Sequence, residues 1–295
     1  MKIGVPAEVK NNEHRVGLTP ESVKTLSDLG HHLFVQSNAG HAIGFTNQLY
    51  ESSGAQIIDS AADVFKQSDL IVKVKEPVES ELQFLRKDLA LFTYLHLAGD
   101  PKKAKKLLET GVTGIAYETV TADDGSLPLL APMSAIAGQL GVVVGSYHLL
   151  KPNDGRGTLL SNLDPRIVTV IGAGVAGKEA IAKAKANHAH VKIIDLNKSK
   201  LEDLKSEFGE EGMEYIISTP DAIKVAISES DIVIGSVYVV GKEAPKVVTR
   251  EMLKEMTEGS VLVDISIDQG GVLRVANPPI MTTQHSSKTV FCIIV

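Results

Sequence analysis

The side chains best suited to chemistry in this sequence are basic residues that follow short apolar runs in the first half. Lys75 follows the apolar run 69–74, and His96 directly follows the run 89–95. Parallel strands end at the sheet edge where ligands bind, which makes both positions suggestive. Arg15 lies in a loop just before a helix start. Lysine and arginine can bind an anionic substrate, and an imidazole can transfer a proton near neutral pH.

A glycine-rich motif in the second half has the spacing of a dinucleotide site. Residues 172–177 form a G-x-G-x-x-G directly after a strand-like run and before a helix-like one. In such a motif Gly172 permits a tight turn, Gly174 lets the backbone approach a pyrophosphate, and Gly177 permits close helix–strand packing. The alternative is a turn that only packs a helix on a sheet. Asp195 ends the next strand-like run, about 20 residues on, where a carboxylate binds a ribose 2′-hydroxyl and repels a 2′-phosphate. The motif predicts NAD rather than NADP.

Each basic candidate also has an ordinary interpretation. Arg15 taken alone is most typical of a surface arginine, and a hydrogen-bonded structural histidine explains His96 equally well. Lys73 and Lys75 are two residues apart, so a continuous strand would point both to one face. Asp268 follows the last strand-like run and fits either the nicotinamide edge of a nucleotide domain or an ordinary loop. The residues alone leave these alternatives open.

The elements that must position these residues alternate along the whole chain, which predicts an α/β fold with largely parallel strands. In the second half the alternation predicts a doubly wound Rossmann sheet. We expect a substrate-binding α/β domain over 1–128, a Rossmann NAD-binding domain with its connecting helix over 129–271, and an aberrant tail over 272–295. The predicted strands are 1–5, 33–36, 69–74, 89–95, 114–117, 167–171, 191–195, 215–218, 231–237 and 260–265; the predicted helices are 21–29, 101–109, 177–187, 199–208, 220–228 and 250–256.

Composition excludes several classes of protein. A 295-residue chain with 43% hydrophobic residues is too apolar for disorder and long enough for about two domains. A single cysteine, Cys292, excludes an intramolecular disulfide, and no cysteine–histidine cluster has zinc spacing, so we expect a cytoplasmic protein without a metal. A net charge of −6 without a basic stripe argues against nucleic acid. Residues 125–150 carry no Asp, Glu, Lys or Arg, but they include prolines and polar side chains, which favours a connecting helix over a membrane span.

Taken together, several blocks resemble the bacterial alanine dehydrogenase family. They are MKIGVPAEVKNNEHRVGLTPESV, DLIVKVKEP, FTYLHLA, LLAPMSAIAG, VIGAGVAG and SVLVDISIDQGG, in order over residues 1–271. The resemblance implies reversible, NAD-dependent oxidative deamination of L-alanine to pyruvate and ammonium by a homo-oligomer, a hexamer in the family. The α subunit of proton-translocating transhydrogenase shares the architecture and some of these blocks.

The resemblance also implies roles for individual residues. Arg15 and Lys75 would bind the substrate carboxylate and carbonyl oxygen, His96 would be the general acid and base, and Asp268 would orient water or ammonia. Closure of the two domains is expected to bring the histidine to the nicotinamide. The residues implied to contact the cofactor are Ser134, Gly172, Gly174, Gly177, Asp195, Ser218, Val237, Tyr238 and Ile267.

The resemblance stops after Gly271. Residues 272–295 show no family likeness by inspection, but codons permitted for them give family-like residues in an adjacent frame, which predicts a frameshift near residue 272 and early termination. A shortened sheet would expose an edge strand, and the β-prone segment 289–295 is expected to pair with that edge or to promote aggregation. Weakened activity is therefore expected. The alternatives are a non-catalytic NAD(H)-binding remnant and a transhydrogenase-like nucleotide-binding subunit.

Overall fold

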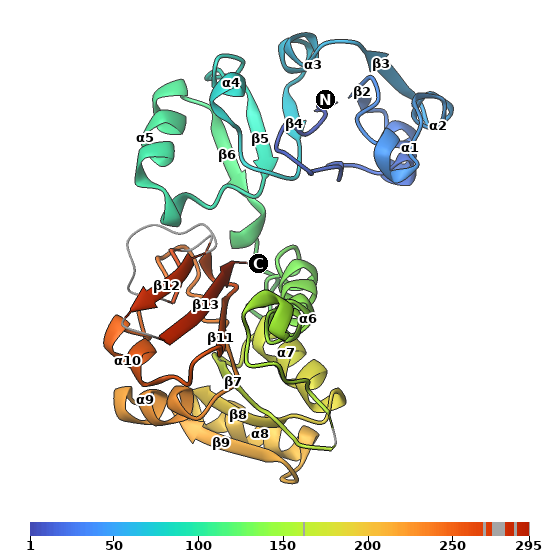
Figure 1. Cartoon of the computed structure of the whole chain (residues 1–295). Helices are drawn as coiled ribbons and strands as arrows, with labels where there is room; N and C mark the ends of the chain where they lie inside the picture. The colour runs from blue at the N-terminus through green and yellow to red at the C-terminus, as the bar shows by residue number, and fades with distance from the viewer. Residues whose placement is uncertain (162, 268–269, 273–280, 286–287, 295) are drawn as a thin grey trace. The chain divides into compact units, whose positions relative to one another are not determined.

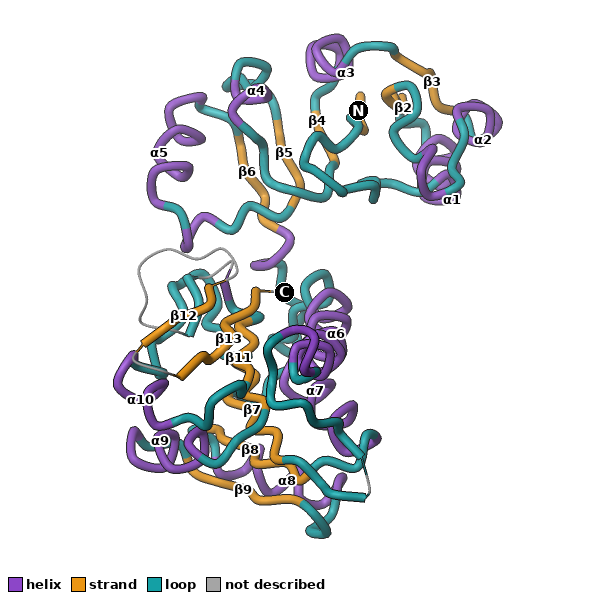
Figure 2. Tube along the Cα trace, in the orientation of Figure 1, coloured by secondary structure: helices purple, strands orange, loops and turns teal. Residues whose placement is uncertain are grey.

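The chain folds into two compact units, Met1–Leu127 and Pro128–Val295, and each is built on its own β-sheet (Figure 1). The computed structural model describes residues 1–161, 163–267, 270–272, 281–285 and 288–294. Figure 2 shows strands and helices alternating along both units. The α/β architecture expected from the sequence is confirmed, and the division falls beside the boundary expected after residue 128.

The first unit has a six-stranded sheet in the order β3-β2-β1-β4-β5-β6. Every neighbouring pair is parallel. The strand order reverses between β1 and β4, as in a doubly wound fold. The elements are β1 (Lys2–Val5), α1 (Pro20–Asp28), β2 (His32–Gln36), α2 (Asn47–Ser52), β3 (Ala55–Ile58), α3 (Ala61–Gln67), β4 (Leu70–Val72), α4 (Glu79–Leu82), β5 (Ala90–Thr93), α5 (Pro101–Thr110) and β6 (Thr113–Ala116).

Helices cover both faces of this sheet. On one face, Val23 of α1 and Tyr50 of α2 pack against apolar side chains of β1 and β2. On the other, Phe65 of α3 and Leu107 of α5 pack against β4 and β5. The start of α1 follows the sequence signal, because the Thr19 side chain accepts a hydrogen bond from the first turn, where proline is favoured. Two buried faces require the apolar strands that the sequence shows.

The second unit has a seven-stranded sheet in the order β12-β13-β11-β10-β7-β8-β9. All neighbours are parallel except the β12–β13 pair. The elements are α6 (Ala131–His148), β7 (Ile167–Ile171), α7 (Val175–Ala186), β8 (His190–Asp195), α8 (Lys198–Phe208), β9 (Met213–Ile217), α9 (Pro220–Ser228), β10 (Ile232–Gly235), α10 (Arg250–Glu255), β11 (Val261–Asp264), β12 (Met281–His285) and β13 (Lys288–Ile294).

Alternate residues of these strands serve two cores. Helices α6, α7 and α8 cover the face that carries Val168, Val170 and Ile193. Helices α9 and α10 cover the opposite face, which carries Ile171 and Ile194. Fully burying one such side chain contributes about 1.5–3 kcal/mol, so these layers hold the strand ends in fixed positions.

Helix α6 lies within residues 125–150, the apolar segment that was predicted to form a connecting helix. It lies so close to α7 that a side chain at Gly138 would meet the carbonyl oxygen of Ala176 at 2.1 Å. Of the helices described here, none is both long and apolar enough to cross a membrane.

The end of the chain joins the second sheet. Strand β13 pairs in parallel with β11, with Val261 opposite Phe291, and β12 pairs antiparallel with β13. The expectation that this segment pairs with the edge of the sheet is therefore confirmed. With β13 in place, the six strands β9-β8-β7-β10-β11-β13 have the order of a complete doubly wound sheet.

Candidate functional site

Three predicted site residues lie on segments at one edge of the first sheet. Arg15 lies in the loop between β1 and α1, Lys75 follows β4, and His96 follows β5. Because β1, β4 and β5 are parallel neighbours, their carboxyl ends share this edge. The strand order reverses between β1 and β4, and such a switch point is where doubly wound sheets bind ligands.

Arg15 is oriented by an acidic neighbour two residues earlier. Its Nε donates to Glu13 Oε1 at 2.9 Å and its Nη2 donates to Oε2 at 2.6 Å. Hydrogen bonding to Glu13 raises the pKa of the Arg15 guanidinium despite partial burial. The same hydrogen bond lowers the pKa of Glu13, with a smaller contribution from the charge of Lys75. Arg15 is a surface residue, as its interpretation taken alone had it, but it is not isolated, because Glu13 pairs with Arg15 and also responds to the charge of Lys75.

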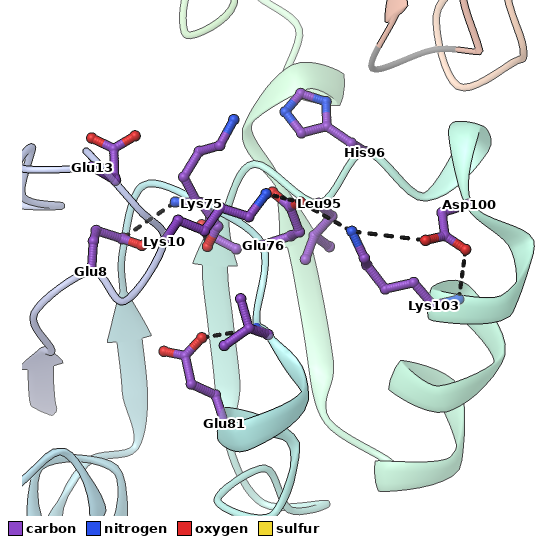
Figure 3. A network of polar contacts seen from close by, with 12 residues as sticks. Glu8, Lys10, Glu13, Lys75, Glu76, Glu81, Leu95, His96, Asp100 and Lys103 are labelled. Atoms are coloured by element: carbon purple, nitrogen blue, oxygen red, sulfur yellow. Dashed lines mark hydrogen bonds and ion pairs between the residues drawn. The ribbon is translucent and has the colours of Figure 1, made fainter. Parts of the chain in front are cut away.

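The two lysines after β4 have different surroundings. Lys73 is fully buried and its Nζ forms ion pairs with Glu8 at 3.1 Å and Glu81 at 3.0 Å. Lys75 is only partly buried, and Figure 3 shows its ammonium extending past the strand end. Strand β4 ends at Val72, so the strict alternation that predicted one face for both lysines does not continue through Lys75. A partly exposed ammonium can bind an anion, whereas Lys73 is part of the core.

His96 is held in an unusual backbone conformation. Its φ is +49° and its ψ is 37°, the left-handed region that few non-glycine residues adopt. The buried carboxylate of Glu118 accepts the His96 N–H at 2.6 Å and the Leu95 N–H at 3.2 Å. The Tyr94 ring stacks on the imidazole with centroids 5.7 Å apart. Residues in strained conformations concentrate at functional sites, where surrounding contacts hold them in place.

Burial also affects the tyrosines beside His96. It raises the pKa of Tyr94, an effect that nearby Arg15 opposes and Glu118 reinforces. Burial likewise raises the pKa of Tyr117, whose ring meets that of Tyr94 edge to face. Both phenols therefore stay neutral near pH 7 and can act only as hydrogen-bonding or packing groups.

A second acidic group lies next to Lys75. The Glu76 carboxylate, 7% exposed, forms ion pairs with Lys10 from the β1–α1 loop and with Lys103 of α5, the latter at 3.0 Å. Burial alone would raise its pKa, but the hydrogen bonds from the two lysines outweigh burial and lower the pKa to about 2. Figure 3 shows how this carboxylate links three segments around the site.

Glu76→Gln is expected to lower the free energy of unfolding at pH 7 by about 1–3 kcal/mol. The pKa is depressed in the folded state, so the ionised carboxylate stabilises the fold above its ordinary pKa of 4.5, and this contribution is lost as the pH falls toward 2. Urea unfolding at several pH values should show the two proteins converging below pH 4.5. Glu79→Gln is the control, because Glu79 pairs with Lys106 on the surface. A difference independent of pH would contradict the assignment.

The glycine loop of the second unit fits a dinucleotide. A side chain at Gly172, whose φ is +96°, would meet the carbonyl oxygen of Ser236 at 2.7 Å, and one at Gly177 would meet the Gly172 carbonyl oxygen at 1.8 Å. A Cβ at Gly174 would have nothing within 4 Å. The first and third glycines are thus required by the fold, whereas the second leaves room for a ligand at the start of α7. That helix start offers N–H groups to a pyrophosphate.

Asp195 and Ser134 flank this loop. Asp195 Oδ2 accepts the N–H of Ala173 at 2.7 Å, so the carboxylate at the end of β8 touches the glycine loop. Ser134 lies one helical turn before Gly138, the α6 residue that contacts Ala176. Residues four apart share a helix face, which places Ser134 on the side of α6 that faces the start of α7. Both positions agree with the predicted cofactor site.

The remaining predicted cofactor residues follow successive strands at the same edge. Ser218 follows β9 and donates its N–H to the Asp195 carbonyl at 3.0 Å. Val237 and Tyr238 follow β10, and Ile267 follows β11. Because these strands are parallel neighbours, the structure brings all four residues to the carboxyl edge that carries the glycine loop.

Asp268 lies outside the residues that the structure describes. Described residues on both sides of it are firmly held: Asp264 Oδ2 accepts the N–H of Val272 at 2.8 Å, and Lys246 donates to the Gly271 carbonyl at 2.9 Å. Across the described ranges, no group of three or more His, Cys, Asp or Glu side chains is placed to hold a metal ion.

Sequence reasoning missed the carboxylates that hold the site residues. Glu8 accepts the Lys75 N–H at 3.2 Å, and Glu118 accepts the His96 N–H. The two partners of the first contact are 67 residues apart in the chain, and those of the second 22. A contact between a side chain and a distant backbone leaves no local pattern. Only the topology could have indicated these contacts, because the segments that follow β1, β4, β5 and β6 all lie at one edge of the sheet.

Comparison with known proteins identifies similar chains over nearly the full length. The family model described as alanine dehydrogenase/PNT, N-terminal domain, matches residues 4–137, and that of the C-terminal domain matches 141–293. The match thus extends beyond Gly271, where inspection of the sequence found no likeness. Alanine dehydrogenase of Staphylococcus epidermidis is 45% identical over 293 residues, which cover 98% of this chain and 77% of that protein.

Solved structures give the same result. An L-alanine dehydrogenase matches with a TM-score of 0.86 and 41% identity, covering 100% of this chain and 83% of the other. A transhydrogenase from Sinorhizobium meliloti matches with a TM-score of 0.78 and 27% identity, covering 99% and 86%. The alanine dehydrogenase is therefore more similar in both sequence and structure.

Proposed function

The chain belongs to the alanine dehydrogenase/PNT family, and from this we propose that it catalyses the reversible oxidative deamination of L-alanine with NAD. The reaction converts L-alanine, NAD⁺ and water to pyruvate, ammonium, NADH and a proton. The observation that supports the proposal is that Arg15, Lys75 and His96 lie on segments that follow β1, β4 and β5, at one edge of the first sheet.

Each of these side chains has a task that suits its chemistry. Arg15, pre-oriented by Glu13, and Lys75 bind the substrate carboxylate and the oxygen of the α-keto acid, since two cations match an anionic substrate. His96 accepts and returns the proton as water adds to the imine carbon and ammonia leaves. NAD, when bound, accepts a hydride from the α-carbon. Asp268 is proposed to orient the water or ammonia.

The cofactor is bound by the second unit. Gly172, Gly174 and Gly177 shape the loop that takes the pyrophosphate, and Asp195 binds the ribose. Ser134 is proposed to meet the phosphate side. Adenine and nicotinamide contacts are proposed for Ser218, Val237, Tyr238 and Ile267.

Asp195→Asn is expected to reduce the preference for NAD over NADP by at least about tenfold, because a like charge beside a 2′-phosphate costs several kcal/mol. The amide keeps one oxygen that can accept the Ala173 N–H, which limits damage to the loop. Fluorescence titration with NADH and NADPH measures the ratio. Asp203→Asn, on the exposed side of α8, should leave the ratio unchanged. An unchanged ratio in Asp195→Asn would remove Asp195 from the ribose site.

The proposed activity is tested by absorbance at 340 nm, where NADH forms from NAD and L-alanine. Turnover with L-alanine but not D-alanine is the expected result. NADH binding without turnover would instead support the non-catalytic alternative, and NADH binding that needs a separate partner for oxidation would support the transhydrogenase-like one.

Assembly and location belong to the same proposal. We propose a homo-oligomer in the cytoplasm, because the family resemblance implies a hexamer and the single cysteine suits a reducing compartment. Sedimentation velocity of the purified chain distinguishes an oligomer from a monomer of 31.5 kDa.

A further inference from the structure

We propose that Glu8 is a positioning residue, whose carboxylate fixes the segment that carries Lys75 to the loop that carries Arg15. This inference rests on the proposed function and adds to it a residue that does not touch the substrate. Glu8 belongs to the loop that follows β1, and Lys75 follows β4. The pairing of β1 with β4 ends with Gly4 opposite Ile71, and beyond that point the Glu8 side chain bridges the two segments.

The contacts of Glu8 are suited to that task. Its Oε1 accepts the N–H groups of Val74 at 2.6 Å and Lys75 at 3.2 Å. Its Oε2 accepts a hydrogen bond from Lys73 Nζ at 3.1 Å. A single carboxylate therefore holds three consecutive residues after β4. Figure 3 shows the contact to the backbone of Lys75, while the ammonium of Lys75 extends away from it.

Burial strengthens these contacts. The side chains of Glu8 and Lys73 are each 1% exposed, so water competes little for either group. A buried carboxylate is stable only when it is paired and hydrogen-bonded, and here Lys73 supplies the opposite charge. Hydrogen bonds with one charged partner are about twice as strong as neutral ones. The β4 end is therefore fixed by a charged group, and the Lys75 side chain leaves from a defined point.

Glu81 provides a matched comparison on the other side of Lys73. Its side chain is 3% exposed and lies 3.0 Å from Lys73 Nζ, and it also accepts one backbone N–H, that of Val78 at 2.9 Å. It belongs to α4, and among the described residues it forms no hydrogen bond with Val74 or Lys75. If both glutamates only neutralise Lys73, their substitution should have equal effects on substrate binding. If Glu8 positions Lys75, only the substitution of Glu8 should affect substrate binding.

The test compares Glu8→Gln with Glu81→Gln. Both changes remove one ion pair of Lys73 without changing size, and both should lower the melting temperature. Glu8→Gln alone is expected to raise KM for pyruvate in the aminating direction by about tenfold, because misplaced binding groups lose affinity steeply. Its Kd for NADH should equal that of the wild type. In Glu81→Gln, KM should stay within about twofold of wild type.

Hydrogen exchange of the Val74 and Lys75 amides, followed by NMR, gives a readout independent of turnover. Exchange should be faster in Glu8→Gln, because the neutral amide oxygen accepts these two N–H groups more weakly than the carboxylate does, and it should be unchanged in Glu81→Gln. If the wild type does not convert L-alanine, the proposed function fails, and the exchange data still decide whether Glu8 holds this segment. If Glu8→Gln does not fold, Glu8→Asp replaces it in the same measurements, because aspartate keeps the charge near Lys73 but its shorter side chain should weaken the contacts with Val74 and Lys75. Equal effects of the Glu8 and Glu81 variants, or no effect at Glu8, would overturn the inference.

Discussion

His96→Asn is expected to lower the turnover of L-alanine by about 10²- to 10⁴-fold, the usual loss when a general acid–base is removed. Asparagine has no group that exchanges protons near neutral pH. NADH binding should be retained, because the glycine loop belongs to the other unit. The measurement is the rate of NADH formation, with the Kd for NADH taken from fluorescence.

Asparagine is the substitution of choice because His96 has a positive φ. Asparagine adopts the left-handed region more readily than alanine does, so the Glu118 contacts with the backbone should persist. His32→Asn is the matched control, since His32 is an exposed residue at the amino end of β2, away from the carboxyl edge. A His96→Asn protein with more than about a tenth of the wild-type rate would contradict the role of His96 as the proton-transfer group.

Gly174→Val is expected to weaken NADH binding by about 100-fold or more while leaving the melting temperature unchanged. The φ of Gly174 is −73°, which valine can adopt, and a Cβ there has nothing within 4 Å. The added side chain therefore meets no protein atom at its base and blocks only the approach of the pyrophosphate. A loss of that size corresponds to about 2.8 kcal/mol of binding free energy.

Gly177→Ala is the matched comparison and is expected to lower the stability of the fold. Its Cβ would lie 1.8 Å from the Gly172 carbonyl oxygen, so the helix must move away from the strand, and overpacking of this kind destabilises by about 1–3 kcal/mol. Thermal unfolding and NADH titration of both variants separate the two glycines. Undiminished NADH binding by Gly174→Val would show that the loop does not carry the pyrophosphate.

The second sheet was largely predictable from the sequence. Strands 167–171 and 191–195 and the helix 220–228 coincide with β7, β8 and α9 to within one residue. The two strands are largely apolar runs, as buried parallel strands require, and the helix begins at Pro220 after the capping residue Thr219. In the first unit β3 and the helices α2, α3 and α4 were not predicted. These are short elements, with four to seven residues each, and so little periodicity accumulates in them.

The chemical groups of the candidate site were predictable from the sequence, but the carboxylates that hold them in place were not. His96 and Lys75 could be singled out because each follows an apolar strand. Glu8 and Glu118 could not, because their roles depend on contacts with backbone groups far away in the chain. The left-handed backbone of His96 was not predicted either, because only a few per cent of non-glycine residues adopt it, even though histidine is enriched among them.

Hydride transfer from the α-carbon of L-alanine to NAD is the reaction that we propose for this chain. The most direct test uses L-alanine deuterated at Cα, with mass spectrometry of the NADH formed. The proposed function predicts that the NADH carries one deuterium. Where hydride transfer limits the rate, NADH should also form more slowly from the deuterated substrate than from unlabelled L-alanine. Unlabelled NADH, or no NADH formed at saturating L-alanine and NAD, would contradict it.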